Sequence, residues 1–378
     1  MKTFLRIFLG LLISLVLIYF FLPGYVQTAL IYQTADIDDY KIFENRTIEA
    51  ATPQAWGNHP SYNSYELEEF ERQELESYKP VAYLVIQDGQ VLYEEYWDGY
   101  GKNSLSNSFS AGKSVVSLLI GIAKDEGYIQ SLDQKIMEFI PEYDNPENKD
   151  LTIKDVLTMS SGLNWDEAYT TPFSMTTEAY YGTDLQGLIK SLKVIEKPGV
   201  RFDYLSGNTE VLAMVVQAAT GKNISEYASE KIWKKIGAEH DALWSLDKEN
   251  GIEKAYCCFN SNARDFARFG QLVLNNGKWD SIQIISEEYL NEATSAANWL
   301  EGEDGSPLWY YGYQYWIIKH KGMEIPYMRG ILGQYIIPIK EKNAVIVRLG
   351  HDRDRTYTNF HPNDVYKYID LGLKILEN

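Results

Sequence analysis

The sequence predicts an α+β fold in which an antiparallel sheet is built from both chain ends and a mostly helical subdomain is inserted between them. Strand-like segments lie near residue 80 and again after residue 310. Between them, apolar residues recur mainly at helical spacing. The chain has 378 residues, which is enough to bury a large core. A sheet shared by the two ends, with the helices inserted, buries all of these segments together.

The first 25 residues form an apolar segment with a basic start. Lys2 and Arg6 precede a run without charge from Ile7 to Leu22. That length suits a short membrane span or a long signal-peptide core, and the basic flank places its start in the cytoplasm. We expect residues 1–25 to be a membrane anchor, which makes the chain a single-pass cell-membrane protein with its main domain outside the cytoplasm. Cleavage as a signal, giving a secreted or periplasmic protein, is the alternative.

Residues 26–78 are predicted to be a spacer that ends in an acidic helix, and residues 79–378 to form the main domain. The helix, over 65–78, carries glutamates on its outer face. Two strand-like segments then flank Asp88-Gly89, which is a hairpin signal.

The next element holds the strongest candidate for chemistry. The apolar run 115–123 predicts a buried helix, and Ser110 and Lys113 stand at its start on one face. This is the Ser-x-x-Lys arrangement, in which a desolvated amine takes the proton of the hydroxyl. Backbone N–H groups at the helix start suit an oxyanion. In the alternative interpretation, Ser110 only caps the helix and Lys113 reaches to water.

A second match to the same motif, Ser245 to Lys248, serves as an internal control. Chance alone gives roughly one or two matches in a chain this long, so context decides between them. The second match lies among charged residues and opens no apolar helix. We therefore predict a surface loop there.

Two more helices are predicted in the middle of the chain, over 151–159 and 211–219. Thr152 caps the first helix, and Gly221 ends the second. Tyr204 lies on the loop before the second helix. A phenol beside a Ser/Lys pair can relay a proton, although plain packing is the alternative in a chain with 29 tyrosines.

The last third returns to strands after one more capped helix at 261–274. The predicted strands are 311–318, 334–338 and 344–349, followed by a closing helix at 362–376. Gly330 lies just before the second strand, where a glycine either lets the strand edge approach a substrate or marks a bulge.

Composition excludes several classes of partner. The formal net charge is −18, so a nucleic-acid partner and a broad docking face for anionic membranes are not expected. The five histidines show no metal-ligand spacing and no glycine-rich phosphate loop appears, so we expect neither metal nor cofactor. The adjacent Cys257 and Cys258 are predicted to be two small buried side chains rather than part of a disulfide framework.

Taken in order, the motifs resemble the serine β-lactamase and penicillin-binding-protein-like hydrolases, in particular the class C-related esterases and the nylon-oligomer hydrolases. The resemblance covers roughly residues 80 to 376. It rests on the sequence and spacing of four pieces, which are Ser110-Ala-Gly-Lys113, Leu151-Thr-Ile through Ser161-Gly162-Leu163, Pro198-Gly199 through Tyr204-Leu-Ser206, and Gly330-Ile-Leu-Gly333-Gln334.

This resemblance implies a β-lactamase/transpeptidase-like fold and a role for each matching residue. Ser110 would be the acylated nucleophile, Lys113 its base, and Tyr204 the proton shuttle to the leaving group. The backbone N–H groups of Ser110 and Ile331 would form the oxyanion hole. Neither a metal nor an organic cofactor is implied.

Three further positions are candidates for substrate binding, namely Ser206, Arg329 and Gly330. Two of them depart from the family pattern. Ser206 stands where the β-lactamases place asparagine, and Met328-Arg329-Gly330 stands where they place a Lys-Thr-Gly-like triplet. Loss of that lysine removes an anchor for a substrate carboxylate. Arg329 either replaces it or, because side chains alternate along a strand, points away.

The predicted function is a serine hydrolase that cleaves ester or amide bonds in a small-molecule or peptide-like substrate through an acyl-enzyme on Ser110. A cell-wall peptidase for D-amino-acid peptides or a weak β-lactamase is a narrower alternative. A non-catalytic ligand-binding or sensor module is an alternative of another class. We expect the loops 164–197 and 296–310 to set specificity.

Overall fold

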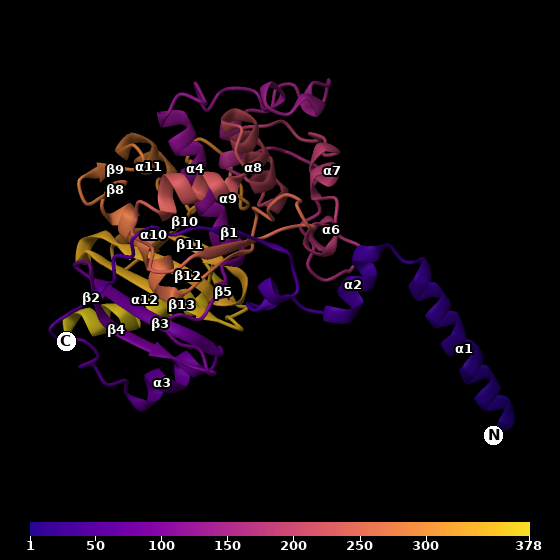
Figure 1. Cartoon of the computed structure of the whole chain (residues 1–378), viewed down its shortest axis with the longest axis horizontal. Coiled ribbons are helices and arrows are strands. Elements are labelled where there is room, and N and C mark those ends of the chain that lie inside the picture. The colour runs from indigo at the N-terminus through magenta and orange to yellow at the C-terminus, as the bar shows by residue number, and fades with distance from the viewer.

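The computed structural model describes residues 1–378, apart from the side chains of Lys2, Leu15 and Val16. A seven-stranded sheet forms the centre of the molecule (Figure 1). Its order is β10 (Trp316–His320), β11 (Met323–Gly330), β12 (Gln334–Ile339), β13 (Ala344–Gly350), β3 (Pro80–Gln87), β4 (Gln90–Tyr96) and β2 (Gly57–Asn58). All neighbours pair antiparallel except β2, which runs parallel to β4 on the edge.

The two chain ends meet at the pairing of β13 with β3. Val345 lies opposite Ile86, and Val347 lies opposite Leu84. Both strands are buried on both faces, because side chains alternate between two layers of helices. The α+β fold predicted from the strands at the two ends is confirmed.

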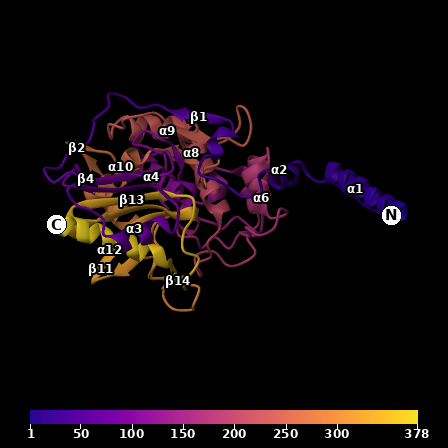
Figure 2. The same cartoon turned by 90° about the horizontal axis from the view of Figure 1, so that it is seen from below.

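One helix covers each face of this sheet (Figure 2). Helix α10 (Ala263–Leu274) packs on the first face, where a Cβ on Gly270 would lie 2.5 Å from Val345. Helix α12 (Asn363–Glu377) packs on the other, where a Cβ on Gly372 would lie 2.2 Å from Ile346. A side chain at either glycine would push its helix off the sheet.

The inserted part of the chain is mostly helical. Its helices are α4 (Gly112–Asp125), α5 (Ile153–Leu157), α6 (Met175–Tyr181), α7 (Leu185–Lys190), α8 (Ser206–Thr220), α9 (Ile224–Ala228) and α11 (Glu287–Ala293). Thr152 caps α5, and Gly221 ends α8 in the left-handed conformation, as predicted. The strand expected from residue 311 starts only at Trp316, because the tyrosines before it pack as buried loop residues.

A smaller sheet of four strands lies beside the helices. It contains β1 (Asn45–Ile48), β6 (Ala242–Ser245), β7 (Phe259–Ser261) and β5 (Ser106–Asn107), in that order. Ser245 is fully buried at the end of β6. The surface loop predicted for Ser245 to Lys248 is therefore wrong, because Ser245, Leu246 and Asp247 are buried and only Lys248 is exposed. Pairing of β6 with β1 and β7 draws this part of the chain into the sheet.

The N-terminal part of the chain has three helices. Helix α1 (Lys2–Phe21) projects away from the body in Figure 1, and Thr3–Phe21 is long and apolar enough to cross a membrane or to serve as a signal sequence. Helix α2 (Gly24–Tyr32) packs against α6. Helix α3 (Glu69–Glu76) lies further along. Residues 26–78, for which the sequence predicts a spacer, also contribute β1 and β2 to the two sheets.

Candidate active site

A sharp turn between β5 and α4 presents Ser110. Phe109 has a φ of 44°, a left-handed conformation that is unusual for a bulky residue. Its backbone N–H donates to Oδ1 of Asn107 at 2.8 Å, which holds the turn. Ser110 then stands half-buried two residues before the start of the buried helix α4. The local strain places the hydroxyl where a substrate can reach it.

Lys113 lies directly behind this hydroxyl. Its Nζ donates to Oγ of Ser110 at 3.0 Å, to Oγ of Ser206 at 3.1 Å and to the carbonyl oxygen of Tyr256 at 2.6 Å. The side chain is only 1% exposed. Burial lowers the pKa of Lys113 to about 8, and the negative charges of Glu167 and Glu210 oppose this shift. The shift brings the pKa of the amine close to neutral pH, so that the neutral form that a general base requires is accessible there.

Ser206 links Lys113 to a carboxylate. Its backbone N–H and its Oγ both donate to Glu167, at 2.6 and 2.7 Å. Because the Ser206 proton goes to Glu167, the lone pairs of its oxygen face the amine of Lys113. Trp165 and Tyr169 donate to the same carboxylate. The sequence gives no sign of this role, since Glu167 is one acidic residue in a loop that belongs to no motif.

Tyr204 lies on the other side of the pair. Its ring centroid is 5.3 Å from Nζ of Lys113. Burial first, and then the charge of Glu167, raise the pKa of Tyr204 well above its ordinary value, while a hydrogen bond with Ser110 lowers it. The phenol is therefore protonated at neutral pH and in this form can donate a proton.

A cavity of about 270 Å³ opens in front of these groups. Ser110, Ser206 and Ile331 all line it, so the two residues whose N–H groups were predicted to form the oxyanion hole face one space. The lining contains aromatic, aliphatic, hydroxyl and amide side chains but no charged one among the described residues. A larger cavity of about 430 Å³ lies between α3 and α12, where the lining residues do not include Ser110.

Gly330 and Arg329 lie outside this lining. A Cβ on Gly330 would stand 2.2 Å from the carbonyl oxygen of Ser108, so the glycine lets β11 approach the turn that presents Ser110. The guanidinium of Arg329 stacks 3.2 Å above the ring of Trp316 and donates to the carbonyl of Phe360. The structure therefore brings together five of the predicted site residues (Ser110, Lys113, Tyr204, Ser206 and Ile331). Arg329 lies outside the cavity lining, but its charge is near enough to lower the pKa of Tyr204.

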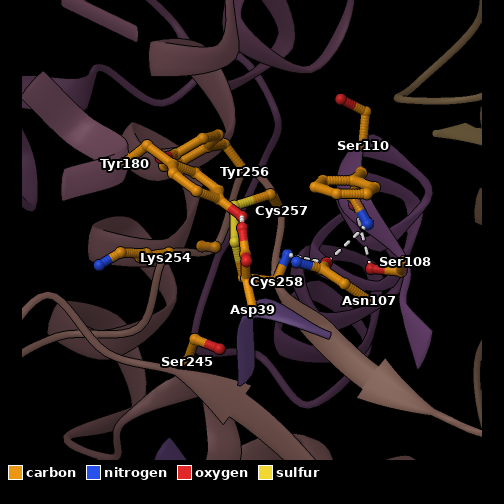
Figure 3. The surroundings of a disulfide bond; sticks show 12 residues. Asp39, Asn107, Ser108, Ser110, Tyr180, Ser245, Lys254, Tyr256, Cys257 and Cys258 are labelled. Carbon is orange, nitrogen blue, oxygen red and sulfur yellow. Dashed lines mark hydrogen bonds between the residues drawn. A yellow bond between two sulfur atoms is a disulfide. The ribbon is translucent and has the colours of Figure 1, made fainter. Parts of the chain in front are cut away.

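Cys257 and Cys258 are both buried, as predicted, and they form a disulfide bond with each other, which the sequence does not predict. Adjacent cysteines can bond only where the backbone takes an unusual shape, and Cys258 has a φ of 66°. Figure 3 shows the disulfide beside Asn107 and Tyr256. Cys257 lines the cavity, and the N–H of Cys258 donates to the same Asn107 oxygen that holds the Ser110 turn.

The described residues contain no cluster of three or more His, Cys, Asp or Glu side chains that could hold a metal ion.

Comparisons with known proteins place this geometry in a family. The family model described as Beta-lactamase matches residues 67–360. The 6-aminohexanoate-dimer hydrolase of Paenarthrobacter ureafaciens is 27% identical over an alignment of 310 residues that covers 76% of this chain and 77% of that protein.

Solved structures share the fold. A putative 6-aminohexanoate-dimer hydrolase from Bacillus anthracis superposes with a TM-score of 0.78 at 23% identity, covering 90% of this chain and 93% of the other. A family VIII carboxylesterase superposes with a TM-score of 0.65 at 16% identity, covering 85% and 99%. The β-lactamase/transpeptidase-like fold and the serine hydrolase class that the sequence predicts are confirmed, and the chain belongs to the beta-lactamase family.

Proposed function

We propose that this chain cleaves ester or amide bonds through an acyl-enzyme on Ser110 and is held at a membrane by α1. The observation that carries the proposal is the 3.0 Å contact between Nζ of Lys113 and Oγ of Ser110. The contact lies at a cavity wall, and the pKa of the amine is lowered to about 8. A lysine that merely reached to water would show neither feature.

Acylation starts with a proton transfer. Neutral Lys113 takes the proton of Ser110, and Oγ attacks the substrate carbonyl carbon. The N–H groups of Ser110 and Ile331 hold the oxyanion that forms. As the bond to the leaving group breaks, the phenol of Tyr204 gives its proton to the leaving oxygen or nitrogen and regains one from the Lys113 ammonium.

Deacylation reverses these roles. A water molecule gives a proton to the amine of Lys113, either directly or through the phenol of Tyr204, and its oxygen attacks the acyl carbon. The bond to Oγ then breaks, and Ser110 recovers its proton. Glu167 holds Ser206 in place throughout and, by its charge, limits how far the pKa of Lys113 falls.

The site favours substrates without a carboxylate near the cleaved bond. Arg329 is engaged by Trp316 and Phe360, and no charged side chain lines the described cavity. A carboxylate entering such a cavity would lose its water shell without gaining a partner. This argues against strong β-lactamase or D-amino-acid carboxypeptidase activity. One relative is named for an amide substrate and one structural neighbour for esters, which supports testing both bonds.

Covalent labelling with a fluorophosphonate serine probe tests the proposal. We expect the full chain to be labelled and Ser110→Ala not to be. Ser245→Ala is the matched control, because it removes the serine of the second Ser-x-x-Lys motif and should label normally. Equal labelling of the Ser110→Ala variant, or hydrolysis of no ester or amide by the parent, would remove Ser110 from the mechanism.

A further inference from the structure

Part of the cavity wall comes from the segment that directly follows the predicted anchor. Gln33, Thr34 and Ala35 line the same cavity as Ser110. They follow the last residue of α2, and only two residues separate α2 from the end of α1. One wall of the cavity that contains Ser110 is therefore joined to the apolar helix by a short, continuous stretch of chain.

This stretch is fixed on the domain at several points. Val26 of α2 is fully buried, and the ring of Tyr32 stacks on that of Tyr181 with 6.1 Å between centroids. Beyond the cavity wall, the carbonyl oxygen of Ile37 accepts from the backbone N–H of Asn107 at 2.9 Å. Asp39 accepts from the hydroxyl of Tyr180 at 2.6 Å, as Figure 3 shows.

The length of this stretch limits the distance from the cavity to a membrane crossed by α1. Helix α2 has nine residues, which span about 13 Å at 1.5 Å per residue. The connection from Phe21 to Gly24 adds about 10 Å when fully extended. The cavity wall at Gln33 is thus at most about 25 Å from the end of the span. The polar headgroup layer fills about 5 to 8 Å of that distance.

The surface at this end of the molecule carries exposed apolar side chains. On α2, Leu30 is 48% and Ile31 is 64% exposed. On the loop that leads into α6, Tyr169 is 55% and Phe173 is 60% exposed, and Tyr169 also lines the cavity. Large apolar side chains that project beside an apolar anchor suit contact with lipid better than contact with water.

We propose that the cavity opens at the membrane surface and takes esters or amides whose acyl part is an apolar chain presented from the lipid bilayer. This inference rests on the proposed function and on retention of α1 as an anchor. The uncharged lining of the cavity receives the chain, and the short connection through α2 keeps Ser110 close to the layer in which such a substrate is dissolved.

A spacer experiment on the full chain tests the distance. The protein is reconstituted in phosphatidylcholine vesicles, with p-nitrophenyl palmitate in the bilayer or p-nitrophenyl butyrate in solution. Six Glu-Ala-Ala-Ala-Lys repeats inserted between Leu22 and Pro23 add a semi-rigid helix of about 45 Å. We expect palmitate turnover to fall by about tenfold or more, because the site no longer reaches the bilayer, and butyrate turnover to stay unchanged. The same repeats added after Asn378 are the matched control and should change neither rate.

A second pair of variants tests the exposed apolar side chains. Leu30→Gln combined with Ile31→Gln should lower palmitate turnover in vesicles and leave butyrate turnover unchanged. Ile282→Gln is the control, because Ile282 is 51% exposed in β9 (Ile282–Gln283) and does not line the cavity.

The outcomes separate this inference from the proposed function. If the spacer leaves the ratio of palmitate to butyrate turnover unchanged, or if butyrate is cleaved and palmitate is not, the inference fails and the proposed function stands. If neither ester is cleaved and Ser110 takes no serine probe, the proposed function fails, and this inference fails with it.

Discussion

The chain contains two Ser-x-x-Lys sequences, and the serine and lysine of the motif are in contact in only one of them. At the start of α4, Nζ of Lys113 lies 3.0 Å from Oγ of Ser110. In the second match, Ser245 ends strand β6 and donates to Oδ1 of Asn45, while Lys248 lies exposed beyond it. Residues three apart share a face on a helix, but they do not do so across a strand end. The motif therefore brings the amine to the hydroxyl only where a helix follows the serine.

The largest expected difference between the two matches concerns the serines. Ser110→Ala should lower ester turnover by about 10⁵-fold or more, since it removes the nucleophile. Ser245→Ala should keep full turnover and lose about 1 kcal/mol of unfolding free energy, because it removes a buried hydrogen bond. Steady-state kinetics and urea unfolding measure both quantities. Similar losses of turnover in the two variants would show that the two motifs do not differ in function.

The lysines should differ next most strongly. Lys113→Met keeps most of the buried volume but removes the base, and we expect turnover to fall by about 10³-fold. Lys248→Met changes an exposed side chain and should leave turnover and stability at parent values. Circular dichroism would show that the Lys113 variant is folded. A folded Lys113→Met variant with parent-like turnover would mean that another group deprotonates Ser110.

The disulfide sharpens the comparison, because it lies beside both matches but the chain next to it contacts a lysine amine of the motif only in the first. In the second match the contact is made by the serine, whose backbone N–H donates to the carbonyl oxygen of Cys258 at 3.0 Å. Tyr256, whose carbonyl oxygen accepts from Nζ of Lys113, directly precedes Cys257. Treatment with dithiothreitol should release the backbone there and lower kcat by about tenfold through misplacement of the amine. The double variant Cys257→Ser, Cys258→Ser should already have the lower kcat and should not respond to dithiothreitol. If kcat of the parent does not change after full reduction, verified by thiol titration, the link between the disulfide and the position of the amine is contradicted.

The smallest expected effect concerns pH. Since the neutral amine is the reactive form and the pKa of Lys113 is about 8, kcat/KM should rise as pH increases through about 8. The charge of Glu167 raises that pKa, so Glu167→Gln should move the rise to lower pH. Lys248→Met should leave the profile in place. A shift to higher pH in the Glu167→Gln variant would show that the carboxylate acts on the amine in some other way.

The sequence predicts those parts of the molecule that depend on local patterns. The hairpin around Asp88-Gly89, the caps at Thr152 and Gly221, and the Ser110/Lys113 pair all follow from spacings within about ten residues. The position of Tyr204 on a loop before a helix makes it only a candidate, since nothing local marks one tyrosine among many, and its role follows from the resemblance to a family.

What the sequence does not predict depends on contacts between distant segments. Glu167 is part of the site only because the fold brings it to Ser206. Gln33 likewise lines the cavity only because the fold of the whole domain places it there. Strands β1 and β2 have four and two residues, too few for any alternation to be recognised. The bond between Cys257 and Cys258 requires a left-handed residue that no sequence rule specifies.

The connection between α2 and the cavity also affects how this enzyme should be prepared for inhibitor discovery. A shortened chain that starts at Pro23 loses the apolar helix and keeps the wall formed by Gln33, Thr34 and Ala35. One that starts at Tyr40 lacks this wall and leaves the N–H of Asn107 without the Ile37 carbonyl. Compounds selected against the second form would be fitted to an opening that the intact enzyme keeps closed.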